Sequence, residues 1–306
     1  MANVNKFIWN IVIPVLFLIY VLFLVWEHNS RSDGNRSKII RQHQIQSKSY
    51  ENIDGVILGG SNAFFGLSAT ELSQLTSLNW VNLSLPNEGF SDINYLNFLY
   101  ETLDYEQRLS VKDIIYSSIT PLRLGRISEI ENNIYDLYGN KGISYIPERS
   151  LAAVIKRYFF DDLQENMNFP LPLSKGDFNF SDFECSIFQN IQYIFERETN
   201  ILLLNSWVTT QMLSISDIFP NATIFFVVPS EFYDNLYDKK KDDALSDRLS
   251  NIIEELSNKS NINNNNFYYV KQKQFPSIDY LCDAIHHSND YGRTWRTSDL
   301  AKFISY

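Results

Sequence analysis

The stretch Gly55-Val56-Ile57-Leu58-Gly59-Gly60-Ser61-Asn62 decides the fold that this chain is expected to adopt. Its first four residues form a short apolar run without polar alternation, which is typical of a strand covered on both faces. Glycine is common in tight turns, so Gly59 and Gly60 predict a sharp turn that leaves Ser61 at the end of the strand. The stretch therefore predicts a buried parallel strand with a serine at the carboxyl edge of the sheet, where ligands of such sheets bind.

Four more short apolar runs predict strands, and helical patterns lie between them. The expected strands cover residues 55–58, 80–83, 113–117, 223–228 and 267–270, and the expected helices cover residues 69–76, 92–103, about 204–218 and 243–257. Strands that alternate with helices imply a parallel sheet with helices on both faces. We therefore expect an α/β fold of three layers, α/β/α, of the flavodoxin-like kind.

The 306 residues divide into three expected parts. Residues 8–26 are almost wholly apolar and long enough for one bilayer crossing, whereas a cleaved signal peptide has an apolar core of about 7–15 residues. We therefore expect a retained transmembrane anchor over residues 1–26. Residues 27–49 are polar and predict a stalk. Residues 50–306 predict the globular domain, with an aromatic-rich insertion at about residues 123–198 whose rings form either a local core, the commoner role, or a surface that stacks on sugars.

Composition excludes several classes of function. The net charge of −10 argues against nucleic-acid binding, which needs a basic face. The two cysteines lack metal-ligand spacing, the sequence has no His-Glu-x-x-His motif, and Gly59-Gly60-Ser61 lacks the glycine spacing of a dinucleotide site, so we expect neither metal nor cofactor. Cys185 and Cys282 are too few for a disulfide framework and do not indicate a redox compartment.

Histidines near the C-terminus give Ser61 a candidate base. His28 and His43 fall in the expected stalk, which leaves His286 and His287 for the globular domain. In Asp283-Ala284-Ile285-His286, one turn can direct a carboxylate and an imidazole toward the same point, so we predict a triad of nucleophile Ser61, base His286 and orienting Asp283. His287 is then expected to point elsewhere. The alternatives are that Gly-Gly-Ser is an ordinary turn and that Asp283 caps a helix.

Three ordered blocks resemble the SGNH/GDSL hydrolase superfamily. They are Gly59-Gly60-Ser61-Asn62, Asn82-Leu83-Ser84-Leu85-Pro86-Asn87-Glu88-Gly89, and Asp283-Ala284-Ile285-His286 followed by Gly292. The resemblance covers roughly residues 50–306. With the expected N-terminal span, the chain is similar to membrane-anchored members that acetylate or deacetylate bacterial exopolysaccharides and cell-wall glycans.

The resemblance implies roles for particular residues. Ser61 matches the nucleophile, His286 the base and Asp283 its partner, and the backbone N–H groups of Ser61 and Gly89 match two oxyanion-hole donors. Gly60 stands where the family usually has Asp. The third block normally supplies an Asn donor after the third strand, but residues 114–121 contain none. Ser117, Ser118, Thr120 and Asn62 are the candidate replacements.

The resemblance also implies a location and partners. It places the domain outside the cytoplasm at a bacterial inner membrane. It also implies a carbohydrate substrate and allows for a membrane-bound partner that donates the acyl group. The basic residues favour the opposite orientation, with the domain in the cytoplasm. Lys6 precedes the span, Arg31, Arg36, Lys38 and Arg41 follow it, and cytoplasmic flanks usually carry the positive charge.

Two hypotheses follow. The first is a serine enzyme that transfers or removes an acyl group, most simply acetyl, on a surface polysaccharide through an acyl-Ser61 intermediate. The second is a non-catalytic glycan-binding or scaffold subunit on the same fold, for which the missing third-block Asn is the main argument.

Overall fold

The computed structural model describes residues 14–15, 17–21, 34–85, 92–118, 121, 172–182, 185, 201–229, 236–259, 266–282 and 287–304. The chain forms two compact units, residues 1–38 with 146–169 and residues 39–145 with 170–306. Nearly all described residues belong to the second unit, and the fold below is that of this unit.

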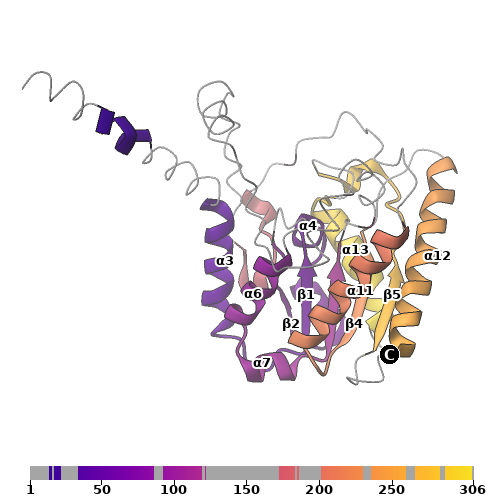
Figure 1. The fold of residues 1–306 in the computed structure, drawn as a ribbon. Helices are drawn as coiled ribbons and strands as arrows, with labels where there is room; N and C mark the ends of the chain where they lie inside the picture. Colours follow the sequence, from indigo (N-terminus) through magenta and orange to yellow (C-terminus); the bar gives the residue numbers. More distant parts are fainter. Residues whose placement is uncertain are drawn as a thin grey trace, which may run out of the picture. The chain divides into compact units, whose positions relative to one another are not determined.

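Five parallel strands form the centre of the second unit (Figure 1). In chain order they are β1 (Gly55–Gly59), β2 (Trp80–Asn82), β3 (Asp113–Ser117), β4 (Thr223–Val228) and β5 (Phe267–Lys271). Their order across the sheet is β2-β1-β3-β4-β5, which is the flavodoxin-like order of doubly wound sheets. The register pairs Gly59 with Ser117 and Ser117 with Val227, so three strands end side by side. The prediction of a parallel α/β sheet is confirmed.

Helices cover both faces of this sheet. On one face, α4 (Ser61–Gly66) and α5 (Ala69–Thr76) pack against α13 (Asp290–Ile304). On the other, α11 (Ile201–Ile218) contacts both α6 (Asp92–Thr102) and α12 (Leu236–Lys259). The remaining described elements are α3 (Gly34–Ser47), α7 (Tyr105–Ser110) and the short 3-10 helices η3 (Ser174–Gly176), η4 (Phe180–Asp182) and η5 (Ile278–Tyr280).

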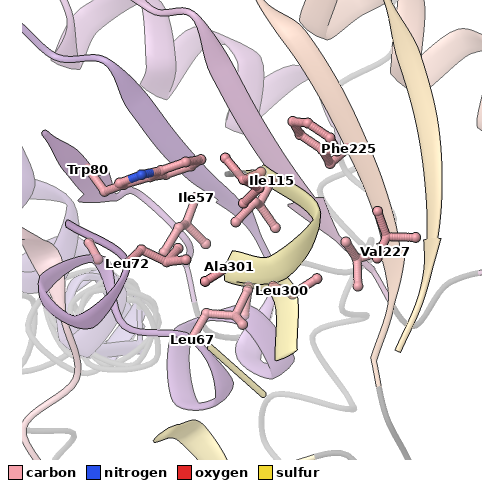
Figure 2. Packing of buried hydrophobic residues seen from close by; sticks show 13 residues of the cluster. Ile57, Leu67, Leu72, Trp80, Ile115, Phe225, Val227, Leu300 and Ala301 are labelled. Carbon is pink, nitrogen blue, oxygen red and sulfur yellow. The ribbon is translucent and has the colours of Figure 1, made fainter. Parts of the chain in front are cut away.

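The core under α5 and α13 explains why the strands read as continuous apolar runs. Figure 2 shows Ile57, Ile115 and Val227 of the sheet packed with Leu72 and Leu300 of the helices. Neighbouring strand residues point to the opposite face, where the rings of Tyr116 and Phe226 lie 6.3 Å from that of Trp207 on α11. Because both faces are buried, neither needs polar side chains.

The globular part begins earlier than the sequence predicts. Residues 27–49 read as a stalk, but α3 is a helix that buries Ile39, His43 and Ser47. These side chains recur every fourth position and so lie on one helix face. The apolar pattern missed this face because two of its three buried side chains are polar.

The predicted anchor and most of the predicted insertion lie largely outside the described residues. Among the residues that are described, no helix combines the length and the apolar character needed to cross a membrane. Of the insertion, the structure describes residues 172–182 and 185.

One part of the insertion is tied to the start of α5. The carboxylate of Asp177 accepts hydrogen bonds from the backbone N–H groups of Ala69 (2.6 Å) and Thr70 (2.9 Å) and from the hydroxyl of Ser68 (3.0 Å). A helix start leaves its first N–H groups without partners in the helix, so Asp177 serves as a cap from more than a hundred residues away. We call residues 172–182 the docking segment.

Candidate active site

The end of β1 turns sharply at Gly59 to place Ser61. Gly59 has a φ of 140°, and a Cβ there would lie 2.1 Å from the carbonyl oxygen of Ser117, so a side chain is excluded. The backbone N–H groups of Ala63 and Phe64 both donate to the Gly60 carbonyl at 3.0 Å, which closes the first turn of α4. Ser61 is the first residue of this helix, as the Gly-Gly turn predicts. We call residues 59–62 the nucleophile turn.

A tyrosine on α6 fixes this turn from the other side. The hydroxyl of Tyr95 accepts the backbone N–H of Gly59 at 3.0 Å and donates to the carbonyl of Leu83 at 3.1 Å. All three groups are buried, so the bonds hold β1 and the segment after β2 in a fixed relation.

The side chain that meets Ser61 is His287. Its Nε2 lies 2.9 Å from Ser61 Oγ, which is within hydrogen-bond distance. The imidazole packs against Phe65 of α4 at a ring-centroid distance of 4.9 Å. Both Ser61 and His287 are half-buried, so the pair is sheltered yet accessible to a small ligand. Nε2 can accept the serine proton when the ring proton sits on Nδ1.

Backbone pairing holds His287 in this position. Its carbonyl accepts the N–H of Cys282 at 2.8 Å, and the N–H of Asn289 donates to the carbonyl of Tyr280 at 3.0 Å. Leu281 and Ser288 form an antiparallel bridge between these two bonds. We call residues 280–289 the base loop.

The start of α13 fixes the register of the base loop. The side chain of Asn289 accepts the N–H of Gly292 at 3.0 Å and donates to the carbonyl of Asp279 at 2.6 Å. A Cβ at Gly292 would lie 2.1 Å from the Tyr280 carbonyl oxygen, so only glycine allows this close approach. His287 therefore comes two residues before a helix cap whose place is determined by packing.

A disulfide crosslinks the base loop to the insertion. Cys282 pairs with Cys185, 97 positions away, and their Cα atoms are 4.8 Å apart. Cys282 is also the residue whose N–H holds the carbonyl of His287. The count of two cysteines left their redox state open, and the structure pairs them.

Aromatic rings of the docking segment complete the wall beside the base. The ring of Phe178 lies 4.6 Å from that of Phe65, which itself contacts His287. The guanidinium of Arg293 donates to the Phe178 carbonyl at 2.7 Å and lies over the ring of Phe180. Phe178 is buried and Phe180 is half-buried, whereas the other aromatic residues of the insertion lie outside the described residues, so the two predictions for them stay predictions.

A buried arginine lies behind the nucleophile turn. Arg296 of α13 is fully buried and donates from Nη1 to the carbonyl of Asn62 at 2.8 Å. Its Nε and Nη2 donate to Gln272 Oε1 at 3.0 and 2.9 Å, and Nη2 lies 3.4 Å from Ser117 Oγ. Burial lowers the pKa of the guanidinium to about 9, so it keeps its charge at neutral pH.

The structure brings Ser61 to the imidazole of His287, the neighbour of the histidine that was chosen from sequence. The expectation that His287 points elsewhere is wrong, since its Nε2 contacts Ser61 Oγ. Asp283, His286 and Gly89 lie outside the described residues, so their predicted roles stay predictions. A signal for His287 was present: Gly292, already part of the resemblance, follows Asn289 with the spacing of a helix start, and His287 lies just ahead of that cap.

The candidate replacements for the third-block Asn are partly resolved. The amide of Asn62 donates to the hydroxyl of Ser117 at 2.7 Å, and both side chains are buried. The Asn62 amide is thus engaged beneath the nucleophile turn. Thr120 lies outside the described residues. In the described part of the chain, no three His, Cys, Asp or Glu side chains gather as a metal site would require.

Comparisons with known proteins give similarity at low identity. No protein-family model matches the sequence, and no curated protein matches it. A Streptococcus pneumoniae protein described as a platelet activating factor aligns with a TM-score of 0.44 and 12% identity over 97% of this chain and 100% of that one. A family two carbohydrate esterase from Clostridium thermocellum gives 0.38 and 10%, and the acetyl xylan esterase Est2A from Butyrivibrio proteoclasticus gives 0.39 and 9%.

For both esterases the alignment covers 83% of this chain and 64% of the other. At these scores and identities the function has to be argued from the residues of the site themselves.

Proposed function

We propose that this protein is a serine acyl-ester enzyme that works through an acyl-Ser61 intermediate. The observation that carries the proposal is the 2.9 Å contact between His287 Nε2 and Ser61 Oγ at the carboxyl edge of the sheet. Serine is a weak nucleophile until a neighbouring base takes its proton, and an imidazole in hydrogen-bond contact is the usual base.

The proposed chemistry has two steps. Ser61 Oγ attacks the carbonyl carbon of the ester while His287 Nε2 takes the hydroxyl proton. The tetrahedral oxyanion collapses, the alkoxide leaves with the proton returned by the imidazolium, and the acyl group stays on Ser61. Water or a second hydroxyl, deprotonated by His287, then attacks the acyl-serine and regenerates the enzyme. Water gives hydrolysis and a sugar hydroxyl gives transfer.

The backbone N–H groups of Ser61 and Gly89 are the proposed donors to the oxyanion, as the sequence blocks imply. One such donor is worth about 2.7–4 kcal/mol of transition-state stabilisation. Asp283 is proposed to hold the proton of His287 on Nδ1. Asp283 lies four positions before His287 and three positions before His286.

The proposed substrate is an acetylated carbohydrate, and the SGNH/GDSL-like blocks are the reason for this choice. A cavity of about 490 Å³ on α13 suits a sugar chemically, because its lining combines the rings of Tyr280, Tyr291 and Trp295 with polar groups of Asp290, Thr294 and Ser298. Tyr280, the first residue of the base loop, and Tyr291, at the start of α13, both line this cavity.

The proposed location is the outer side of a bacterial inner membrane, with the domain anchored by residues 1–26 and an acyl-donor partner in the membrane. The Cys185–Cys282 disulfide supports an oxidising compartment, since disulfides are rare in the cytoplasm. This argument opposes the count of basic residues around the expected span.

An active-site probe tests the proposal. A fluorophosphonate should label the wild-type protein once, at Ser61, and should spare Ser61→Ala. Ser49→Ala, which changes an exposed serine in the turn after α3, is the matched control and should label like the wild type. No labelling of the wild type, under conditions in which a control esterase reacts, would overturn the proposal.

A scaffold subunit on the same fold is the second candidate. It is favoured by one observation, the engagement of the Asn62 amide with Ser117 where the family pattern would place a third oxyanion donor nearby. If Ser61→Ala and His287→Ala leave polysaccharide acetylation intact while loss of the domain abolishes it, this second function is correct.

A further inference from the structure

Arg296 is buried against the nucleophile turn and has no charged partner among the described residues. Its four hydrogen bonds go to a backbone carbonyl, a hydroxyl and an amide oxygen, none of which carries a charge. No described carboxylate forms an ion pair with it. Asp299, one turn further along α13, instead lies 3.5 Å from Lys302 and 3.9 Å from Lys273.

A residue on α4 makes room for this arginine. A Cβ at Gly66 would lie 2.0 Å from Arg296 Nη1, so the glycine allows the guanidinium to reach the Asn62 carbonyl. Taking a charge out of water costs several kcal/mol, and neutral partners offset only part of that cost. A neutral side chain of similar size would fill this place more cheaply, which points to a use for the charge.

The place of the charge indicates that use. Arg296 contacts the residue that follows Ser61 and the last residue of β3, where the SGNH-like pattern would lead to its Asn donor. In a water-poor interior the field of a charge reaches several ångströms with little screening. A fixed positive charge there stabilises negative charge that develops at Ser61 in the transition state.

We propose that Arg296 is a positioning residue that holds the nucleophile turn and whose charge stabilises the oxyanion formed at Ser61. This inference rests on the proposed serine chemistry and deepens it, because it names a group that offsets the absent third-block Asn. Arg296 acts through the turn and through its field, without touching the substrate.

Gln272 offers a test that separates charge from architecture. Its Oε1 accepts both Nε and Nη2 of Arg296, so Gln272→Glu converts this contact into an ion pair and gives up only the long 3.4 Å hydrogen bond from Gln272 Nε2 to the Arg296 carbonyl. The carboxylate introduced by Gln272→Glu would cancel the positive field of Arg296 but would bind the guanidinium more strongly than the amide does. We expect the melting temperature to stay within a few degrees of wild type or rise, while kcat falls about 10–100-fold with little change in KM.

Gln272→Met is the matched control. It removes the partner but keeps the charge, so we expect a lower melting temperature and a smaller loss of kcat than in Gln272→Glu. A purely architectural Arg296 predicts the reverse order, with Gln272→Glu as active as wild type and Gln272→Met the more impaired. That reverse order would overturn the inference.

Substitutions of Arg296 itself give the second readout. Arg296→Lys keeps a charge and Arg296→Met does not, and both lose the fork of donors. We expect the lysine variant to retain at least about tenfold more activity than the methionine variant at equal folded fraction. Equal losses in the two would overturn the inference. Labelling of the wild type with the fluorophosphonate separates the proposed function from the role of Arg296. If the wild type is not labelled, the proposed function is contradicted. If the wild type is labelled and Gln272→Glu has the kcat of the wild type, only the role of Arg296 is contradicted.

Discussion

The nucleophile turn and the base loop meet at one hydrogen bond, yet they are built in different ways. Ser61 is placed at the end of β1 by its immediate neighbours, the glycines that turn the chain and the first turn of α4, and Tyr95 and Arg296 then hold this turn from other helices. His287 is placed by groups far along the chain or across the fold, namely the helix cap, the antiparallel bridge and the disulfide to Cys185. The position of Ser61 can therefore be predicted from the local sequence, whereas the position of His287 depends on tertiary contacts and cannot.

The largest expected effect comes from removing either half. Ser61→Ala and His287→Ala should each lower kcat by about 10³–10⁴-fold, because each removes one partner of the contact that activates the serine. The double variant should be no slower than the worse single variant. Steady-state kinetics with a small acetyl ester checks this, and additive losses would show that the two residues do not act as a unit.

Opening the disulfide should loosen the base loop and also destabilise the fold. Cys185→Ser should lower kcat about tenfold and stability by about 2–4 kcal/mol, because the bond closes a long loop and holds the residue whose N–H binds His287. Treatment with dithiothreitol should reproduce the loss in the wild type and add nothing in Cys185→Ser. A reduced wild type with full activity would contradict the link between Cys282 and the base.

The docking segment should matter for stability more than for chemistry. Asp177→Ala removes a buried carboxylate that accepts three hydrogen bonds and should cost about 3 kcal/mol in the free energy of unfolding. Asp104→Ala, which removes the exposed cap of α7, is the matched control and should cost about 1 kcal/mol. Urea denaturation checks the order, and an equal cost for the two would contradict the docking role.

The smallest expected effect is a pH dependence set by α3. Burial lowers the pKa of His43 to about 4, although a contact with the Ser84 backbone, short of hydrogen-bond geometry, opposes this. As pH falls below about 6.5 the unfolded chain takes up a proton that the folded chain refuses, so this histidine makes the wild type lose stability from pH 6.5 toward 4.

His43→Leu should remove that dependence. The free energy of unfolding of the variant relative to wild type should rise by roughly 2 kcal/mol between pH 7 and pH 5. Burial raises the pKa of Asp113 to about 6, with the opposite sign over this range, but it is present in both proteins and cancels in the difference. A difference that does not change with pH would place His43 in water.

The sequence predicted the sheet closely because four of its five strands, β1 to β4, are buried on both faces and so form continuous apolar runs. The strand over residues 113–117 and the one over residues 223–228 have the predicted bounds. The helix predicted over residues 243–257 spans Leu236–Lys259, since its polar first turns carry no apolar signal.

The site was predicted in part. Ser61 follows from the local pattern, but the choice between two adjacent histidines depends on register, and a shift of one residue changes where a side chain points. Asn289 and Gly292 set that register through contacts with residues 279–280, which no local rule anticipates. Arg296 was missed because no helix was predicted over residues 290–304 and because an arginine side chain is rarely fully buried.

The pairing of Ser61 with His287 is tested most directly by the rate at which a fluorophosphonate labels Ser61 in two neighbouring variants. His287→Ala should slow labelling at least about 100-fold, because the base that takes the serine proton is gone. His286→Ala should stay within about threefold of wild type, since it leaves the contact between His287 Nε2 and Ser61 Oγ in place. Fast labelling of His287→Ala together with slow labelling of His286→Ala would contradict the account.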